Sequence, residues 1–128
     1  MPQFLVAIQH PDNYQLPEGP EGEAMIREIS ALNREMIAAG VRDFAGGLQA
    51  AGKAKSLRKQ DDGEVLITDG PYLEAKEHTG GVWLLKCADM EEALEWARRA
   101  VVACRVPVEV REFLEIPPKW KADGGGSQ

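Results

Sequence analysis

An α+β fold, in which two helices cover one face of an antiparallel sheet, is the fold class that the sequence predicts. Strand-like and helix-like stretches follow one another in the order βαββαβ, which is typical of such a sheet. An Asp-Gly pair between two short strand-like runs indicates an inserted β-hairpin in the middle of the chain. The 128 residues, 44% of them hydrophobic, suit one core.

The N-terminal third predicts a buried strand, a loop and an amphipathic helix. The apolar run Phe4–Ile8 is typical of a strand buried on both faces, and the Pro- and Gly-rich residues 10–22 are expected to form a loop. Apolar residues at helical spacing predict a helix over Glu23–Ala39, which Gly40 is suited to end in the left-handed conformation. The apolar face of this helix contains Met25, Ile29, Leu32 and Met36.

Residues 41–48 show a strand-like apolar pattern that Gly46 and Gly47 interrupt. Glycines inside a strand mark either a bend at a sheet edge or a place where a ligand approaches the backbone, so Gly47 is a candidate ligand contact. Residues 55–59 and 64–68 then flank the Asp-Gly pair and are expected to form the two arms of the hairpin.

The densest group of polar side chains follows the second arm, in the stretch LITDGPYLEAKEHTGG over residues 66–81. Asp69, Gly70 and Pro71 predict a tight turn at the end of the strand. The loop after this turn is expected to expose a set of ionisable residues, namely Tyr72, Glu74, Lys76, Glu77 and His78. We take this stretch as the candidate site, and the glycine pair at its end is expected to lead into a buried strand over residues 82–87.

The last third predicts a capped helix and a closing strand. Asp89, with Glu92 three residues later, is suited to cap a helix. The expected apolar face of that helix contains Met90, Leu94, Ala97 and Val101, and the residues expected at the solvent or at a rim are Trp96, Arg98 and Arg99. Residues 106–112 alternate between apolar and polar, as in a strand with one wet face.

We expect one domain over residues 1–116 and a partly disordered tail over residues 117–128. Two helices on one face leave the other face of the sheet open. The strand over residues 82–87 has large apolar side chains on both sides, so this open face needs a cover. A second copy of the chain is the simplest cover, and a homodimer through the open sheet face is the prediction.

Composition and charge argue against several classes of partner. The formal net charge of -6 disfavours nucleic-acid binding, which requires neutralisation of phosphates. No apolar stretch is long enough to span a membrane and no signal-peptide pattern is present, so a soluble cytoplasmic protein is expected. Cys87 and Cys104 lack metal-ligand spacing and are expected to be reduced thiols. The sequence contains no phosphate loop or dinucleotide fingerprint, and we predict neither a cofactor nor a metal.

The string VLITDGPYLEAKE over residues 65–77, followed by Gly80 and Gly81, resembles the signature of the YCII-related, DGPF-type domain family. Matches in the same order extend the resemblance over nearly all of residues 1–115. The resemblance implies a ferredoxin-like fold that forms dimers of the dimeric α+β barrel type. It also implies a range of activities, because some relatives resemble small-molecule lyases or dehalogenating enzymes and similar domains occur beside extracytoplasmic-function sigma factors.

Asp69 is the first candidate for a catalytic group. A carboxylate at the mouth of a semi-apolar cavity is suited to act as a general acid or base, but an Asp before Gly-Pro also caps turns, and both interpretations stay open. Many members of the resembled family have a pocket-facing histidine on the first helix, whereas Ile29 stands at the aligned position here. Asp69 therefore needs His10 or His78 as its partner.

Two hypotheses about function follow. In the first, the protein is a small-molecule lyase, isomerase or dehalogenase-like enzyme with Asp69, His78 and His10 as catalytic groups. Its ligand contacts are then Tyr72, Glu74, Lys76 and Gly47. In the second, the protein is a non-catalytic ligand-binding or regulatory dimer, one form of which is linked to sigma-factor regulation. The two differ in whether Asp69 lies in a closed cavity beside a second titratable group.

Overall fold

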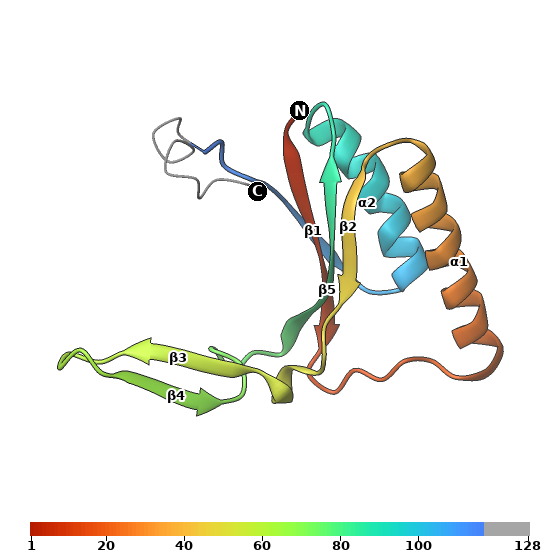
Figure 1. The fold of residues 1–128 in the computed structure, drawn as a ribbon. Coiled ribbons are helices and arrows are strands. Elements are labelled where there is room, and N and C mark those ends of the chain that lie inside the picture. The colour runs from red at the N-terminus through yellow and green to blue at the C-terminus, as the bar shows by residue number, and fades with distance from the viewer. Residues whose placement is uncertain (117–128) are drawn as a thin grey trace.

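Two helices pack on one face of a four-stranded antiparallel sheet, and a two-stranded hairpin extends away from that sheet (Figure 1). The computed structural model describes residues 1–116, so the tail predicted over residues 117–128 lies outside the described residues. The elements in chain order are β1 (Gln3–Pro11), α1 (Gly19–Ala38), β2 (Arg42–Gly47), η1 (Ala51–Lys53), β3 (Lys55–Lys59), β4 (Val65–Asp69), β5 (Glu77–Lys86), α2 (Met90–Cys104) and β6 (Val108–Glu112).

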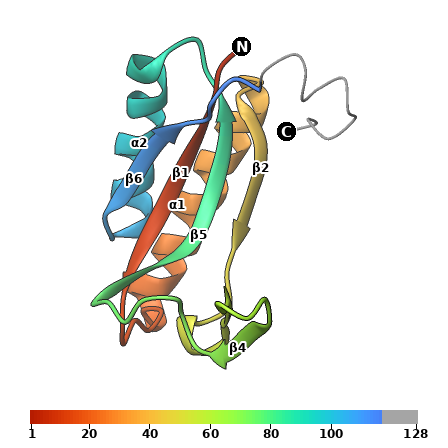
Figure 2. The same ribbon diagram turned by 90° about the vertical axis from the view of Figure 1, so that its left-hand side faces the viewer.

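The strands of the main sheet lie in the order β2-β5-β1-β6, and each neighbouring pair is antiparallel (Figure 2). With α1 between β1 and β2, and α2 between β5 and β6, this topology is ferredoxin-like. The predicted α+β fold class is therefore confirmed. The inserted hairpin is confirmed as well, because β3 and β4 form a separate two-stranded sheet whose turn contains Gly63 at a φ of 88°.

The long helix α1 begins at Gly19, earlier than predicted, because Pro20 is compatible with the first helical turn. Met25, Leu32 and Met36 are buried, as the helical spacing predicts. The chain leaves the helix through Gly40, which adopts a φ of 74° and relieves the steric cost of the left-handed conformation. The predicted apolar face and the predicted end of this helix are confirmed.

Strands β1 and β5 are longer than the sequence predicts. His10 lies in β1 instead of the predicted loop over residues 10–22, and His78 lies in β5 instead of the predicted loop after Pro71. Both strands are extended because their polar ends pair with each other. His10 is opposite His78 and Pro11 is opposite Glu77 in the antiparallel ladder. The register shifts between Ile8 and Gln9, so the apolar and polar halves of the pairing are offset by a bulge.

The buried face of helix α2 overlaps the predicted one at Ala97 but is shifted away from Met90 and Val101. Its buried residues are Ala93, Ala97, Ala100, Ala103 and Cys104, whereas Met90 and Val101 are 38% and 40% exposed. Small side chains allow the helix backbone to lie close to the sheet, and a search for large apolar residues misses such a face. Trp96, expected at the solvent or a rim, instead packs partly buried against the core.

The predicted cap of α2 is confirmed. The Asp89 carboxylate accepts a hydrogen bond from the Glu92 backbone N–H at 2.9 Å. At the other end of the helix, Arg105 adopts a φ of 61° and forms ion pairs with Glu21 and Glu28 of α1. These pairs connect the end of α2 to α1. Over residues 1–116, neither helix combines the length and the apolar character that a bilayer crossing needs.

Candidate functional site

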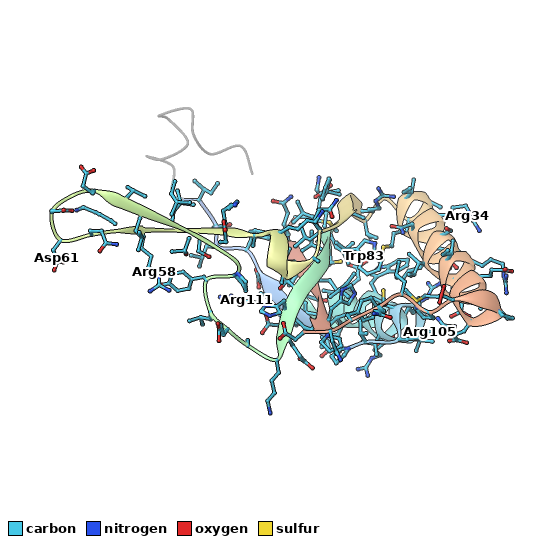
Figure 3. The ribbon with its side chains drawn as sticks, turned by 90° about the horizontal axis from the view of Figure 1, so that it is seen from below. Arg34, Arg58, Asp61, Trp83, Arg105 and Arg111 are labelled. Atoms are coloured by element: carbon cyan, nitrogen blue, oxygen red, sulfur yellow. The ribbon has the colours of Figure 1, made fainter. Side chains whose placement is uncertain are left out.

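A cavity of about 580 Å³ lies between α1 and the β2-β5-β1 part of the sheet. Ile8, Val82 and Trp83 contribute to its sheet side, and Met25, Ile29 and Ile37 to its helix side. Trp83 is one of the side chains between the sheet and the helices (Figure 3). The lining of the cavity is mainly apolar, and the cavity volume is in the usual range for small-molecule sites. The cavity is therefore the candidate functional site.

Glycines on two neighbouring strands make room for this cavity. Gly47 of β2 is paired with Gly81 of β5, and both face the side of the sheet that α1 covers, as do Ala45 and Trp83. A Cβ atom on Gly81 would lie 3.1 Å from the carbonyl oxygen of Gly46 and 3.2 Å from Ile8 Cδ1. The backbones approach so closely that a side chain there would require its neighbours to move by a few tenths of an ångström. Gly47 lies both on an edge strand of the sheet and in the cavity wall, so both interpretations of Gly46 and Gly47, the sheet-edge bend and the ligand contact, stay open.

His10 lies against the cavity at the end of β1 and is held from two sides. Its ring occupies the space beside Gly80, since a Cβ atom on Gly80 would lie only 2.0 Å from His10 Nδ1. The ring also stacks on Tyr14, with 3.8 Å between ring centroids and an interplanar angle of 7°. The Tyr14 backbone N–H donates to the Pro11 carbonyl at 3.0 Å, and this turn brings Tyr14 back over His10. Burial lowers the pKa of His10 from its ordinary value of 6.5, so the imidazole is neutral at pH 7.

His78 lies beside His10 in the antiparallel ladder and has a fixed partner. Its Nε2 atom is 3.0 Å from an Asp12 carboxylate oxygen, and its side chain is 15% exposed. The Asp12 backbone N–H in turn donates to the Lys76 carbonyl at 2.8 Å. His78 also lines a second hollow, of about 440 Å³, together with Tyr72. The structure thus brings the two histidines together, although they are far apart in the sequence.

The remaining predicted residues lie away from the cavity. The Asp69 side chain is 84% exposed on the hairpin and forms an ion pair with Lys55 across it. Glu74 and Lys76 are exposed in the loop between β4 and β5. None of these three side chains lines the cavity, so their roles in catalysis or ligand binding stay predictions. Within residues 1–116, no three His, Cys, Asp or Glu side chains are grouped to hold a metal ion.

Several residues of the site are not among the site residues predicted from the sequence. The Trp83 indole N–H donates to the Asn33 side-chain oxygen at 2.8 Å, and the Asn33 amide donates to the Ile29 carbonyl at 3.1 Å, which fixes the cavity wall. The Tyr14 hydroxyl is buried and has no hydrogen-bond partner among residues 1–116. Cys104 lines the cavity, and burial raises its pKa to about 11, so its thiol stays protonated and is a poor nucleophile. In the sequence, Asn33 is a polar residue at the border of an apolar helix face, and this position was the only available signal for these additional site residues.

The partly buried imidazole of His10 makes the free energy of unfolding depend on pH. Below pH 6.5, His10 takes up a proton in the unfolded chain but stays neutral in the folded chain, where its pKa is lower. The free energy of unfolding is therefore expected to fall as the pH drops from 6.5 towards the lowered pKa of folded His10. This contribution is fully present above pH 6.5. Urea unfolding between neutral and mildly acidic pH measures it. His10→Gln, which cannot be protonated, is expected to flatten the decline, and an identical decline in this variant would contradict the burial of His10.

The fold and the cavity define a class of protein: a small α+β protein with room for a small molecule between its first helix and its four-stranded sheet. Residues 3–117 match the family model of the YCII-related domain, and the chain belongs to this family. It is 37% identical over 78 residues to an uncharacterized protein of Rhizobium meliloti (strain 1021). That match covers 61% of this chain and 62% of the relative. The resemblance that the DGPYLEAKE string indicates is therefore confirmed.

Proposed function

We propose that this protein binds a small, mainly apolar molecule between α1 and the sheet, with His10 as the acid–base group at the polar end of that molecule. One observation supports this above all: a neutral, partly desolvated imidazole adjoins an apolar cavity of about 580 Å³. A neutral imidazole can accept a proton, and proton transfer is a step that lyases and isomerases share. The proposal replaces the Asp69-centred pocket with a pocket centred on His10.

The surroundings of His10 support a specific orientation of its ring. Tyr14 on one side and the backbone at Gly80 on the other restrict the rotation of the His10 ring. The ring nitrogen that accepts the proton therefore has a defined direction relative to the bound molecule. Ile29 and Trp83 offer the ligand apolar contact. Such contact supplies affinity without competing for the polar end of the ligand.

A thermal-shift screen of small neutral and anionic compounds tests the binding part of this proposal. Compounds that stabilise the wild type are expected to lose their effect on Gly47→Leu, whose added side chain extends into the cavity from a Cβ position 3.9 Å from its nearest neighbour. At about 100 times its Kd, a ligand adds about 2.7 kcal/mol to the free energy of unfolding. Gly52→Leu is the matched control, because a Cβ atom there has no neighbour within 4 Å and Gly52 does not line the cavity. Hits that stabilise Gly47→Leu as strongly as the wild type would refute the proposed site.

A deuterium-exchange measurement tests the acid–base part. A bound compound with an acidic C–H group is expected to incorporate deuterium from D₂O in the presence of the wild type, as followed by NMR of the compound. His10→Gln is expected to bind the same compound and lose this exchange, because glutamine is not a base at neutral pH. Undiminished exchange with His10→Gln would assign the chemistry to another group.

The proposal includes a homodimer through the open sheet face, opposite the helices. Register pairs place Phe44, Leu84 and Leu5 side by side on this face, in a row across β2, β5 and β1. Phe44 is 55% exposed in the single chain, and the other two are only partly covered. Association of two such faces removes these apolar side chains from water, which favours a dimer.

A further inference from the structure

Two arginines lie at the cavity, one on each side of it: Arg34 on α1 and Arg42 on β2 (Arg34 is labelled in Figure 3). The position of Arg42 depends on a bulge. The pairing of β2 with β5 shifts register between Arg42 and Phe44, so Arg42 pairs with the buried Leu85 while Ala45 pairs with the buried Trp83. Strand residues three apart normally face opposite sides of a sheet, and the bulge turns both to the side that α1 covers.

Within the described part of the chain, these two arginines have no ion pair, unlike the arginines of α2 and of its C-terminal end. Arg99 is paired with Glu35 at 2.7 Å, Arg105 with Glu21 and Glu28, and Arg98 with Glu95. Among residues 1–116, no carboxylate forms an ion pair or hydrogen bond with Arg34 or Arg42. The chain has 21 acidic residues and a net charge of -6, so carboxylates are not scarce. Two cations beside an apolar cavity that lack a protein anion are suited to an anion from outside.

We infer that the molecule bound in this cavity is an elongated apolar carboxylate, with its anionic end between Arg34 and Arg42. The inference rests on the proposed function and adds a substrate class to it. A guanidinium group matches the two oxygens of a carboxylate with parallel hydrogen bonds. The apolar lining between Ile8, Ile29 and Trp83 then surrounds the hydrocarbon part.

The length of β2 separates the anionic end from His10. Arg42 and Gly47 are at opposite ends of β2, roughly 16 Å apart at about 3.3 Å per residue. Gly47 and His10 both line the cavity near its far end. A ligand that reaches both ends therefore has its carboxylate at the arginines and its reacting polar group several bonds away, beside His10.

Paired probes that differ only in charge test this inference. The probes are 8-phenyloctanoate with 8-phenyloctanamide, and decanoate with decanamide, whose chains are long enough to reach from the arginines towards Gly47, titrated against the full chain by isothermal calorimetry. Each acid is expected to bind about threefold to tenfold more tightly than its amide, a smaller factor than a fully buried pair would give because Arg34 is exposed. The advantage of the acid is expected to shrink with added salt, since exposed charges are screened.

Three charge-removing variants locate the effect. Arg42→Gln and Arg34→Gln are expected to reduce the advantage of the acid and leave the amide unchanged. Arg27→Gln removes the same charge from α1 at a position outside the cavity lining, and it is expected to retain the advantage. Equal affinities for acid and amide, or an advantage that persists in both cavity variants, would overturn the inference.

The outcome for this inference is separate from that for the proposed function. If acid and amide bind equally and both lose affinity in Gly47→Leu, the cavity binds small molecules without selecting an anion, and only the inference fails. If the acid is preferred but Gly47→Leu does not weaken it, the arginines bind anions at the surface, and the inference fails together with the proposed site. If neither acid nor amide binds while other neutral compounds do, the carboxylate class is wrong and the cavity remains.

Discussion

Gly80→Ala is expected to expel the His10 ring from its place beside the cavity. The new Cβ atom would lie 2.0 Å from His10 Nδ1, 2.4 Å from Cε1 and 2.6 Å from Cγ, and a stacked ring has little room to yield. Overpacking of this kind typically costs about 1–3 kcal/mol in the free energy of unfolding. The backbone at Gly80 has an ordinary φ, so the cost comes from the ring and not from backbone strain.

The pKa of His10, followed by NMR, distinguishes this effect from a general loss of stability. A displaced ring is exposed to water, and its pKa is expected to rise towards the ordinary value of 6.5. The double variant His10→Ala/Gly80→Ala is expected to recover part of the lost stability, because it removes the ring that the methyl group meets. Gly47→Ala is the matched control, since its Cβ atom would lie 3.9 Å from the nearest atom. An unshifted pKa of His10 in Gly80→Ala would contradict the described contact.

If the proposed homodimer forms through the open sheet face, Leu84→Asp is expected to convert it into a folded monomer. Leu84 is in the middle of the apolar row with Leu5 and Phe44, so a dimer through this face would bury the new carboxylate against a second copy of itself. Burial of two like charges without partners costs several kcal/mol, more than one contact row can offset. Light scattering after size-exclusion chromatography is expected to give twice the mass of one chain for the wild type and the mass of one chain for the variant.

The dimer prediction needs a control for surface charge alone. Val102→Asp adds the same charge to α2 at a side chain that is 70% exposed, and it is expected to leave the dimer intact. If Leu84→Asp does not fold, as judged by circular dichroism, Phe44→Asp places the charge at the 55% exposed end of the same row. A wild type that is monomeric, or a dimer that survives both sheet-face variants, would refute the interface.

The features that sequence predicted well are local. The Asp89 cap, the Gly40 helix end and the Asp-Gly hairpin each depend on residues within a few positions of one another. Their physical causes act within a few neighbouring residues. These causes are unpaired backbone N–H groups at a helix start, left-handed φ values and turn geometry. The apolar face of α1 is also local, because helical spacing determines which side chains share a side.

The features that sequence missed depend on pairing between distant strands. The cavity exists because Gly47 is opposite Gly81, and His10 lies at its wall because β1 and β5 pair through Pro11 and Glu77. No window of the chain contains both members of these pairs. The dense polar stretch over residues 66–81 drew attention to Asp69, yet its contribution to the cavity comes from the glycines at its end. Ile29, at the position where related proteins are expected to have a histidine, forms part of the apolar wall opposite the sheet.

Methyl NMR on protein labelled at the isoleucine δ1 positions tests the central claim, that a small molecule binds between α1 and the sheet. Ile8, Ile29 and Ile37 line the cavity, whereas Ile67 is 60% exposed on the hairpin and serves as an internal reference. On titration with a compound that stabilises the protein, the three cavity methyl signals are expected to shift with one common Kd while the Ile67 signal stays in place. Shifts confined to Ile67, with unchanged signals from Ile8 and Ile29, would contradict the account.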